Sequence, residues 1–442
     1  MAPSPPPSPA ASLSHARWWR IGQTAGAQAV AKVVSGISQL AIVPLLLHHL
    51  GTENFGWLMA LVALAGLVQF ADLGVQTALQ HELAEAWSRG DESGLRKIYV
   101  AGGRVLTLLG LAWCGLALPL AWWLGPRLVA TPGGGPAHGA WIVLVIAICA
   151  AVRISAGAKL AAAIQAGWIP AVWSAAANAM AVLACLLATR SGGGLALFLF
   201  ILTAALVLPG AFAEWQAGKK LGWQRSAAPA VDAGLARRLW RSGLQFAPAN
   251  LSGGLLLAAV PVALVRFGGY EASATFATLQ RLFGPVAHAH SLAIGPLWPA
   301  YTEARARRDD AWVHRAFRIS LGATLAAAAV IVALAALLPW IAPWWLGAGA
   351  VRPPPAFMWL LVAWNSAAMV VSALTYFLLG HGVMARLSPM LTWLQLLTLA
   401  AVIPLGARWG ATGVAAALLA GLVFGQLPVL ARACEPSFRP AR

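Results

Sequence analysis

Long apolar segments alternate with short polar ones along the whole chain. A bilayer core is crossed by about 20 apolar residues, and backbone polar groups cannot stay unpaired in lipid. The pattern therefore predicts an all-α polytopic membrane protein with about 12 transmembrane helices. The expected spans are residues 22–47, 55–80, 98–124, 139–164, 169–189, 195–217, 242–266, 273–298, 317–346, 354–379, 384–406 and 409–431.

The second half of the chain repeats the first at an offset of 218 residues (271 − 53). Duplicated halves of apolar segments are how many transporters are built, with the substrate site between the halves. We therefore expect two six-helix repeat bundles, 22–217 and 242–431, in the same orientation around a central cavity. The repeated residues include Glu53, Glu85, Arg89 and Asp91, which recur as Glu271, Glu303, Arg307 and Asp309, and Gly51, Leu61, Leu64, Gly66, Val68 and Leu79, which recur as Gly269, Leu279, Leu282, Gly284, Val286 and Leu297.

Composition excludes a soluble protein and orients the chain. Sixty per cent of the residues are hydrophobic and 10% are charged, with a mean hydropathy of +0.75. The net charge is +17, with 30 Lys and Arg residues. Nineteen of these lie in alternate loops and tails on one side of the membrane, five lie on the other side, and six lie within the spans or close to their ends. This positive-inside bias predicts a multi-pass protein with both termini in the cytoplasm. Because the charge forms no continuous basic patch, we expect no nucleic-acid partner.

Segments outside the spans suggest little further structure. The Pro/Ser-rich residues 1–21 are expected to be a disordered cytoplasmic N-terminus without the apolar core of a signal peptide, and 432–442 a cytoplasmic tail. The basic linker 218–241 is either a helix lying on the inner membrane surface or an ordinary positive-inside linker. Four cysteines without a CxxC spacing predict neither a disulfide nor a metal site.

Cationic side chains inside the spans are the strongest candidate functional residues. A charge at the bilayer centre costs roughly 3 kcal/mol or more, so it usually faces a cavity or a partner. Lys32 either faces a cavity or snorkels to the interface or makes a structural pair. Arg153 lies mid-membrane in the fourth span, and Arg281 lies inside the eighth. We expect all three to meet near the midplane as a substrate-binding site for an anionic solute, because guanidinium forms bidentate hydrogen bonds to phosphate.

Other polar residues share helical faces with these cations and are expected to line the cavity. They are Gln28 and Gln39 beside Lys32, Gln69 and Gln76 beside Asp72, Thr278 beside Arg281, and Asn250 at the repeat position of Lys32.

Two titratable residues in the spans are candidates for a coupling group or an ion pair. Asp72 is a counter-ion for Lys32 or Arg281, a protonatable coupling group, or a residue facing a cytoplasmic crevice. His288 either titrates near neutral pH or makes a helix–helix contact. The three readings of Asp72 and the two of His288 stay open at the level of sequence.

One stretch of the chain resembles a known family. Ile42-Val43-Pro44, Leu50-Gly51-Thr52-Glu53-Asn54-Phe55-Gly56 and Ala71-Asp72-Leu73-Gly74-Val75 give the spacing P…LG-x-x-x-FG…DLG. This spacing resembles the opening of bacterial polysaccharide flippases, the O-antigen and exopolysaccharide exporters of the multidrug/oligosaccharidyl-lipid/polysaccharide superfamily. The likeness covers about residues 18–320 in hydropathy and loop pattern.

The resemblance implies a polyprenyl-pyrophosphate-linked oligosaccharide as cargo and a cavity that opens alternately to each side of the bacterial inner membrane. It also implies other polysaccharide assembly proteins as partners. Asp72 alone of the candidate residues lies in the matching motif, since Lys32, Arg153 and Arg281 are chosen by depth. The expected function is a flippase for O-antigen (lipopolysaccharide) or exopolysaccharide assembly, with no catalytic residue, metal or cofactor.

Three other functions compete with this one. A multidrug or cation-coupled exporter of the same superfamily should have an acidic cavity, whereas here one deep acid faces at least three deep cations. The peptidoglycan precursor flippase usually has fourteen spans, against twelve here. A membrane enzyme needs a substantial external site, and the external loops contain no HExxH, nucleotide loop or paired carboxylates. We therefore expect a transporter and no enzyme.

Overall fold

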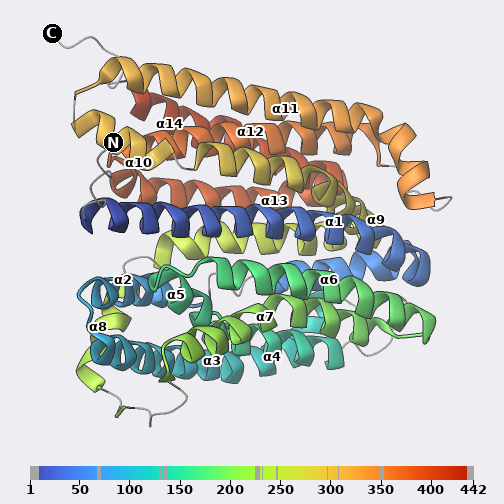
Figure 1. The fold of residues 1–442 in the computed structure, drawn as a ribbon. Coiled ribbons are helices and arrows are strands. Elements are labelled where there is room, and N and C mark those ends of the chain that lie inside the picture. Colours follow the sequence, from blue (N-terminus) through green and yellow to red (C-terminus); the bar gives the residue numbers. More distant parts are fainter. Residues whose placement is uncertain are drawn as a thin grey trace, which may run out of the picture.

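The computed structural model describes residues 9–66, 71–128, 132, 138–223, 229–230, 232–244, 247–295, 297–306, 308–347 and 353–435. Every secondary-structure element in this part of the chain is a helix, so the predicted all-α fold is confirmed (Figure 1). The N-terminal bundle contains α1 (Pro9–Ala65), α2 (Val75–Ser88), α3 (Glu92–Leu128), α4 (His138–Ile154), α5 (Ala156–Ala163), α6 (Trp168–Arg190) and α7 (Leu195–Lys220). The C-terminal bundle contains α9 (Ala247–Ile294), α10 (Leu297–Ala306), α11 (Asp310–Leu346), α12 (Pro355–Gly380), α13 (Met384–Ala420), the π-helix Gly421–Gln426 and α14 (Leu427–Cys434).

Three glycines divide long helices into pairs of membrane spans. Gly51 in α1 has φ 75° and ψ 168°, and Gly269 in α9 has φ 77° and ψ 175°. These are the same residues that the 218-residue offset relates, so the repeat in sequence is also a repeat in backbone conformation. Gly410 (φ 60°, ψ −140°) divides α13 in the same way. With these divisions each bundle has six spans, and eight segments of the described chain are long and apolar enough to cross a membrane.

The loops that enter the third span of each bundle are also built alike. Asp91 Oδ1 accepts the backbone N–H of Gly94 at 2.8 Å at the start of α3. Its repeat counterpart Asp309 accepts the N–H of Trp312 at 3.1 Å at the start of α11. A side-chain oxygen in this position satisfies a helix N–H that has no intrahelical partner. The repeated aspartates are therefore helix caps.

The two bundles share one hydrophobic core and have separate cores elsewhere. We call the end that carries Gly51, Gly269 and Gly410 the turn end, and the opposite end, where α1 begins and α14 finishes, the terminal end. At the turn end a single core joins buried residues of both bundles, among them Phe55 and Phe283. At the terminal end one core lies around α2, α3, α5 and α7, and another lies around α10, α11, α12 and α14.

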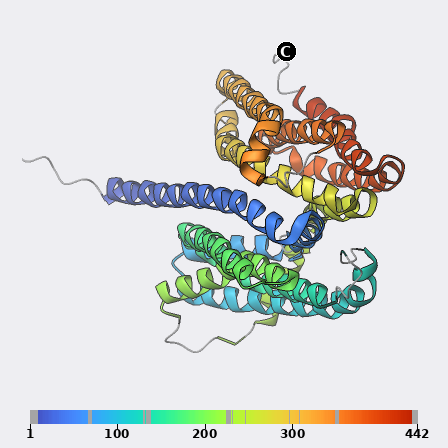
Figure 2. The ribbon, with the colours of Figure 1, turned by 90° about the vertical axis from the view of Figure 1, so that its right-hand side faces the viewer.

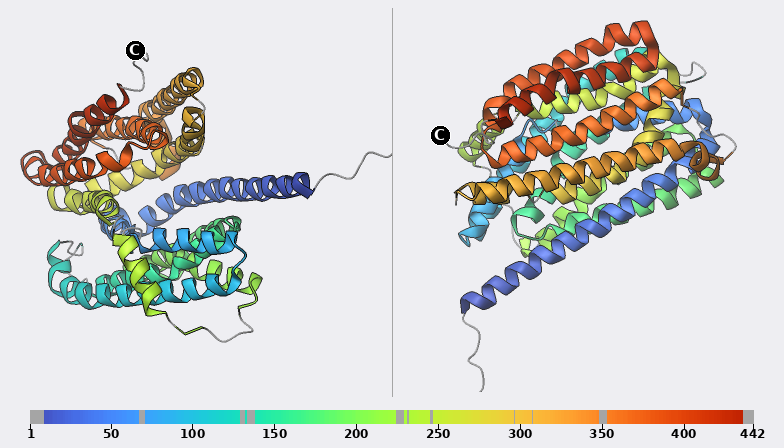
Figure 3. Two further views of the ribbon diagram at one scale, coloured as in Figure 1. Left: turned by 90° about the vertical axis from the view of Figure 1, so that its left-hand side faces the viewer. Right: turned by 90° about the horizontal axis from the view of Figure 1, so that it is seen from above.

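Helix α1 lies between the bundles, and its first part projects sideways out of them (Figure 2). Its residues Val30, Val33 and Ile37 are 62%, 61% and 63% exposed, whereas Leu46 and Leu58 are fully buried. The other views show its first turns projecting beyond the neighbouring helices (Figure 3). Helix α1 begins at Pro9, so residues 9–21 are helical where we expected disorder; the Ala-rich sequence after Pro9 favours a helix.

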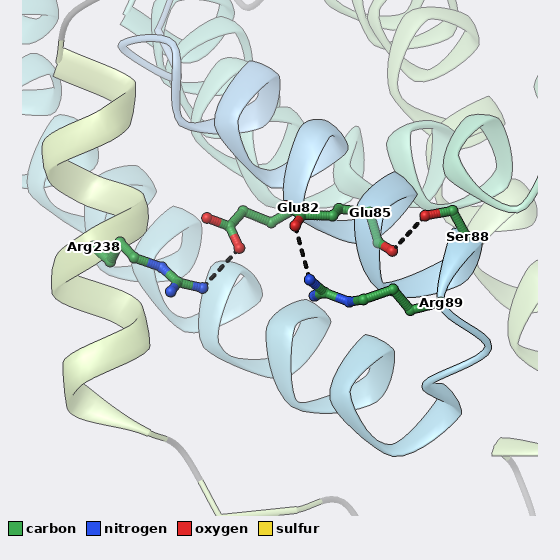
Figure 4. Close-up of polar contacts among 5 residues, drawn as sticks. All are labelled: Glu82, Glu85, Ser88, Arg89 and Arg238. Carbon is green, nitrogen blue, oxygen red and sulfur yellow. Dashed lines mark hydrogen bonds and ion pairs between the residues drawn. The ribbon is translucent and has the colours of Figure 1, made fainter.

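The linker between the bundles contains helix α8 (Ala233–Leu244). Leu239 of α8 is fully buried in the core formed with α2 and α3, and Arg238 Nη2 lies 2.7 Å from Glu82 Oε2 of α2 (Figure 4). Glu85 of α2 and Arg89, the residue that follows this helix, form a second ion pair at 2.8 Å nearby. The helix that we considered for the linker is present, but Leu239 packs on the N-terminal bundle rather than facing lipid.

Candidate functional site

The bundles meet most closely where α1 and α9 cross near the turn end. A Cβ atom added to Gly56 would lie 1.9 Å from the carbonyl oxygen of Tyr270, so only glycine allows this approach. Ser273 Oγ donates a hydrogen bond to Gly56 O at 3.0 Å. Trp345 Nε1 of α11 donates to Leu40 O of α1 at 2.9 Å. We call this contact between α1 and α9 around Gly56 and Ser273 the seam.

Arg281 of α9 lies at the inner edge of the seam. Its Nη1 donates to Met59 Sδ of the other bundle at 2.7 Å, and the side chain is half-buried. No carboxylate of the described residues lies within ion-pair distance of the guanidinium. A thioether is a weak acceptor and carries no charge. Arg281 is therefore a cation between the bundles whose charge the described protein groups leave uncompensated.

The other polar residues that we expected to line the cavity differ in their exposure. Thr278 is buried and its hydroxyl donates to Ala274 O of its own helix at 2.8 Å. Lys32, Gln28 and Gln39 of α1 are exposed. The side chain of Asn250 and all of Gln69 lie outside the described residues.

Arg153 is held differently from the free cation that we expected. Its guanidinium makes two hydrogen bonds to the Glu214 carboxylate of α7, at 2.8 and 2.9 Å, and lies 5.5 Å from the centre of the Tyr99 ring. Both side chains of the pair are about one-third exposed, at 31% and 32%. Arg153 thus ties α4 to α7 within the N-terminal bundle, and neither hydrogen bond nor ion pair in the described chain joins it to Lys32 or Arg281.

Asp72 lies just before α2 and makes a hydrogen bond to the backbone of this helix. Its Oδ2 accepts the backbone N–H of Gln76 at 2.9 Å, in the first turn of α2. Gln76 in turn donates its side-chain amide to Ser155 Oγ at 2.5 Å and to Val152 O at 3.3 Å. No ion pair in the described chain links Asp72 to Lys32 or Arg281, so the structure gives no support to the counter-ion reading.

His288 is exposed, and its Nδ1 lies 2.8 Å from Gly284 O of the same helix. Two residues further on, His290 is buried against α11. Sequence reasoning missed His290, although the 218-residue offset relates it to Asp72. It also missed Glu214, whose signal was an acid inside the expected sixth span.

Comparison with known proteins finds similar folds among solved structures. No protein-family model matches the sequence, and no curated protein matches it. Among solved structures, the lipid II flippase MurJ in an inward closed conformation has a TM-score of 0.66 at 13% identity, covering 92% of this chain and 87% of its own. An inward-facing multidrug resistance MATE family transporter of the MOP superfamily has a TM-score of 0.62 at 18% identity, covering 93% and 96%.

A third similar structure is a MOP superfamily transporter from Pyrococcus furiosus whose reverse polarity of the binding pocket suggests a different function. Its TM-score is 0.57 at 14% identity, and the match covers 95% of this chain and 96% of that one. At these identities the likeness shows the fold alone: the chain has the multi-pass helical architecture of these three structures.

Proposed function

We propose that this protein is an inner-membrane flippase that moves a polyprenyl-pyrophosphate-linked oligosaccharide from the cytoplasmic to the periplasmic leaflet for O-antigen or exopolysaccharide assembly. The observation that carries the proposal is Arg281, a cation between the bundles without a carboxylate partner among the described residues. Pyrophosphate offers the oxygens that a guanidinium binds most strongly. Lys32, on the exposed part of α1, would supply a second cation on the path of the head group, with Gln28 and Gln39 beside it.

The arrangement of the cores supports an alternating-access mechanism that starts from an inward-open state. With the charge bias orienting both termini to the cytoplasm, the terminal end faces the cytoplasm. The bundles have separate cores at that end and share one core at the turn end. The head group would enter between the separate cores and reach Arg281. Separation of the seam would then release it outside.

In this proposal Arg153 has a structural role and does not bind the cargo. Because Glu214 neutralises its charge, we assign Arg153 to holding α4 against α7. Breaking such a pair by removing one partner leaves the other charge unpaired, which is destabilising in a partly buried position.

The experiment is complementation of a deletion strain, with the lipid-linked glycan pool extracted and its membrane side tested by an impermeant glycosidase. Arg281→Ala should trap completed lipid-linked repeat units on the cytoplasmic side, whereas Arg281→Lys should retain part of the export. The matched control is Arg266→Ala, which removes an exposed cation from the same helix and should export normally. Normal export by Arg281→Ala, at wild-type protein levels in the membrane, would refute the proposal.

A multidrug exporter is the second candidate, favoured by the similarity to the MATE transporter over 96% of that chain. Cation exporters need an acidic group in the cavity, whereas Asp72 is engaged with the α2 N-terminus and Glu214 with Arg153. A deletion strain with a normal glycan pool but increased sensitivity to cationic drugs would favour this candidate.

A further inference from the structure

The repeat places a titratable side chain at the same position in both bundles. His290 lies 218 residues after Asp72 (290 − 72), and the two side chains are only 5% and 4% exposed. Each lies where the second span of its bundle is interrupted: Asp72 immediately before α2, and His290 just before the end of α9 at Ile294. A buried ionisable group inside a membrane bundle is a candidate functional residue by default.

The hydrogen bonds of His290 indicate where a further proton would bind. Its Nε2 lies 2.8 Å from Thr324 Oγ1 of α11. The Thr324 hydroxyl already donates to Ser320 O at 2.8 Å, so it can only accept from the ring. Nε2 therefore carries the hydrogen, and Nδ1 is the basic nitrogen. No hydrogen bond to Nδ1 is found among the described residues.

The described side chains around His290 provide no counter-ion for a protonated ring. No ion pair of the described chain includes it. Helix α12 has Tyr376 as its single titratable residue, and the charged residues of α11 lie in its first nine positions. The packed elements carry the following titratable and charged residues. They are Arg266, Tyr270, Glu271, Arg281 and His288 on α9, Asp310, His314, Arg315 and Arg318 on α11, Tyr301, Glu303 and Arg305 on α10, Arg386 and Arg408 on α13, Arg237, Arg238 and Arg241 on α8, and Lys32, His48, His49 and Glu53 on the part of α1 whose side chains are described.

A proton on His290 therefore creates an unpaired charge inside an apolar bundle. Burying an unpaired charge is far more costly than burying a neutral hydrogen-bonded group. The imidazolium is stabilised by any rearrangement that brings water to it, which here means separating α9 from α11. Proton binding and a change in the packing of the C-terminal bundle are thus linked, because each favours the other.

We propose that His290 is the proton-binding site of the C-terminal bundle, where a proton taken from water onto Nδ1 loosens α9 from α11 and so supplies the driving step for movement of this bundle. Asp72 occupies the equivalent position in the N-terminal bundle, where its carboxylate accepts the backbone N–H of Gln76. Proton binding at His290 does not depend on the proposed flippase function, because it needs no cargo. Only the role of this proton in transport rests on that proposed function.

The test is hydrogen–deuterium exchange of the full chain in lipid nanodiscs at about pH 5.5 and about pH 8, the range in which histidine changes charge. After correction for the intrinsic pH dependence of exchange, peptides spanning 286–295 and 317–328 should exchange faster at the lower pH. His290→Gln should abolish this difference. The matched control His288→Gln, two residues away on the exposed side of the same helix, should keep it in full.

A second variant keeps the test decisive if His290→Gln does not fold. Thr324→Val retains the ring but removes its hydrogen-bond partner, and should move the midpoint of the pH response to lower pH, because the imidazolium donates the stronger hydrogen bond. A wild-type protein without the pH response, a His290→Gln protein that retains it, or an unmoved midpoint in Thr324→Val would each overturn the proposal. None of these outcomes depends on glycan export, so failure here leaves the flippase proposal standing.

Discussion

Replacing Gly56 with alanine tests whether the seam between α1 and α9 keeps the turn end closed. The added Cβ would lie 1.9 Å from the carbonyl oxygen and 2.7 Å from the carbonyl carbon of Tyr270, and 3.2 Å from Ala274 N. All three atoms belong to the backbone of α9, so no side-chain rotation can relieve the clash. Ordinary contact begins at 3.4 Å, so the helices must separate locally by about 1.5 Å (3.4 − 1.9).

The energetic effect follows from the packing. Inserting a methyl group into a well-packed contact costs typically about 1–3 kcal/mol. That cost applies to the sealed arrangement and is absent where α1 and α9 have separated. The ratio of sealed to unsealed molecules should therefore fall by roughly 5- to 150-fold. The separation should also remove the hydrogen bond from Ser273 to Gly56.

The assay uses Ser273→Cys as a reporter in a background without the four native cysteines. Ser273 is 1% exposed in the sealed structure, so an impermeant maleimide should label the reporter slowly. Adding Gly56→Ala should raise the labelling rate, whereas adding Gly36→Ala should not, because the nearest atom to a Cβ there is Pro285 Cγ at 3.8 Å. Equal labelling rates for the two alanine variants, with the protein correctly folded, would refute the steric argument.

Further predictions concern stability and are measured by thermal or denaturant unfolding of the purified protein. Arg153→Ala should destabilise by roughly 2 kcal/mol by leaving Glu214 unpaired, and the double variant with Glu214→Ala should cost clearly less than the sum of the single changes; strict additivity would contradict the pairing. Arg308 has φ 59° where its repeat counterpart Gly90 has φ 72°, so Arg308→Gly should stabilise by up to about 1 kcal/mol, and a lower melting temperature would count against strain at this turn. The backbone N–H that Asp91 caps, aided by a neighbouring hydroxyl, holds the pKa of this carboxyl below its ordinary value of 3.8. Since the pKa of Asp91 is lower in the folded state, its stabilisation is fully present above the unfolded-state pKa and is lost as the pH falls through the folded-state pKa. Asp91→Asn should remove this part of the loss of stability in acid. An Asp91→Asn protein whose stability falls with pH as steeply as that of the wild type would disprove this prediction.

Much of the architecture could be predicted because it is determined locally. The lengths of the spans can be read from single segments, and the 218-residue offset can be read by comparing two stretches of the sequence. The repeated glycines Gly51 and Gly269 indeed adopt the same conformation. Asp72 lay in a recognisable motif, and its cap on α2 is also a short-range interaction.

The candidate site was harder to predict because it depends on which way each helix faces. Depth in the membrane singled out Arg153, but its partner Glu214 lies 61 residues away on another helix. His288 and His290 have the same depth to within about 3 Å, yet they face opposite sides of α9, and only packing against α11 buries one of them. Helix α8 was anticipated, but amphipathicity does not distinguish a protein surface from a lipid surface.

The seam has one further consequence. Gly56 and Ala274 are repeat counterparts (274 − 56 = 218), and they touch one another, so the contact is of the kind that two identical halves would form as a symmetric homodimer. The charges around it have not stayed symmetric, since the counterpart of Arg281 is Ala63 and that of Lys32 is Asn250. A dimer of identical halves would offer an anionic head group two equivalent cations and two equal orientations. Fusing the halves into one polypeptide lets this protein keep a single guanidinium at the contact between them, which under the proposed flippase function would favour one orientation of the head group over the other.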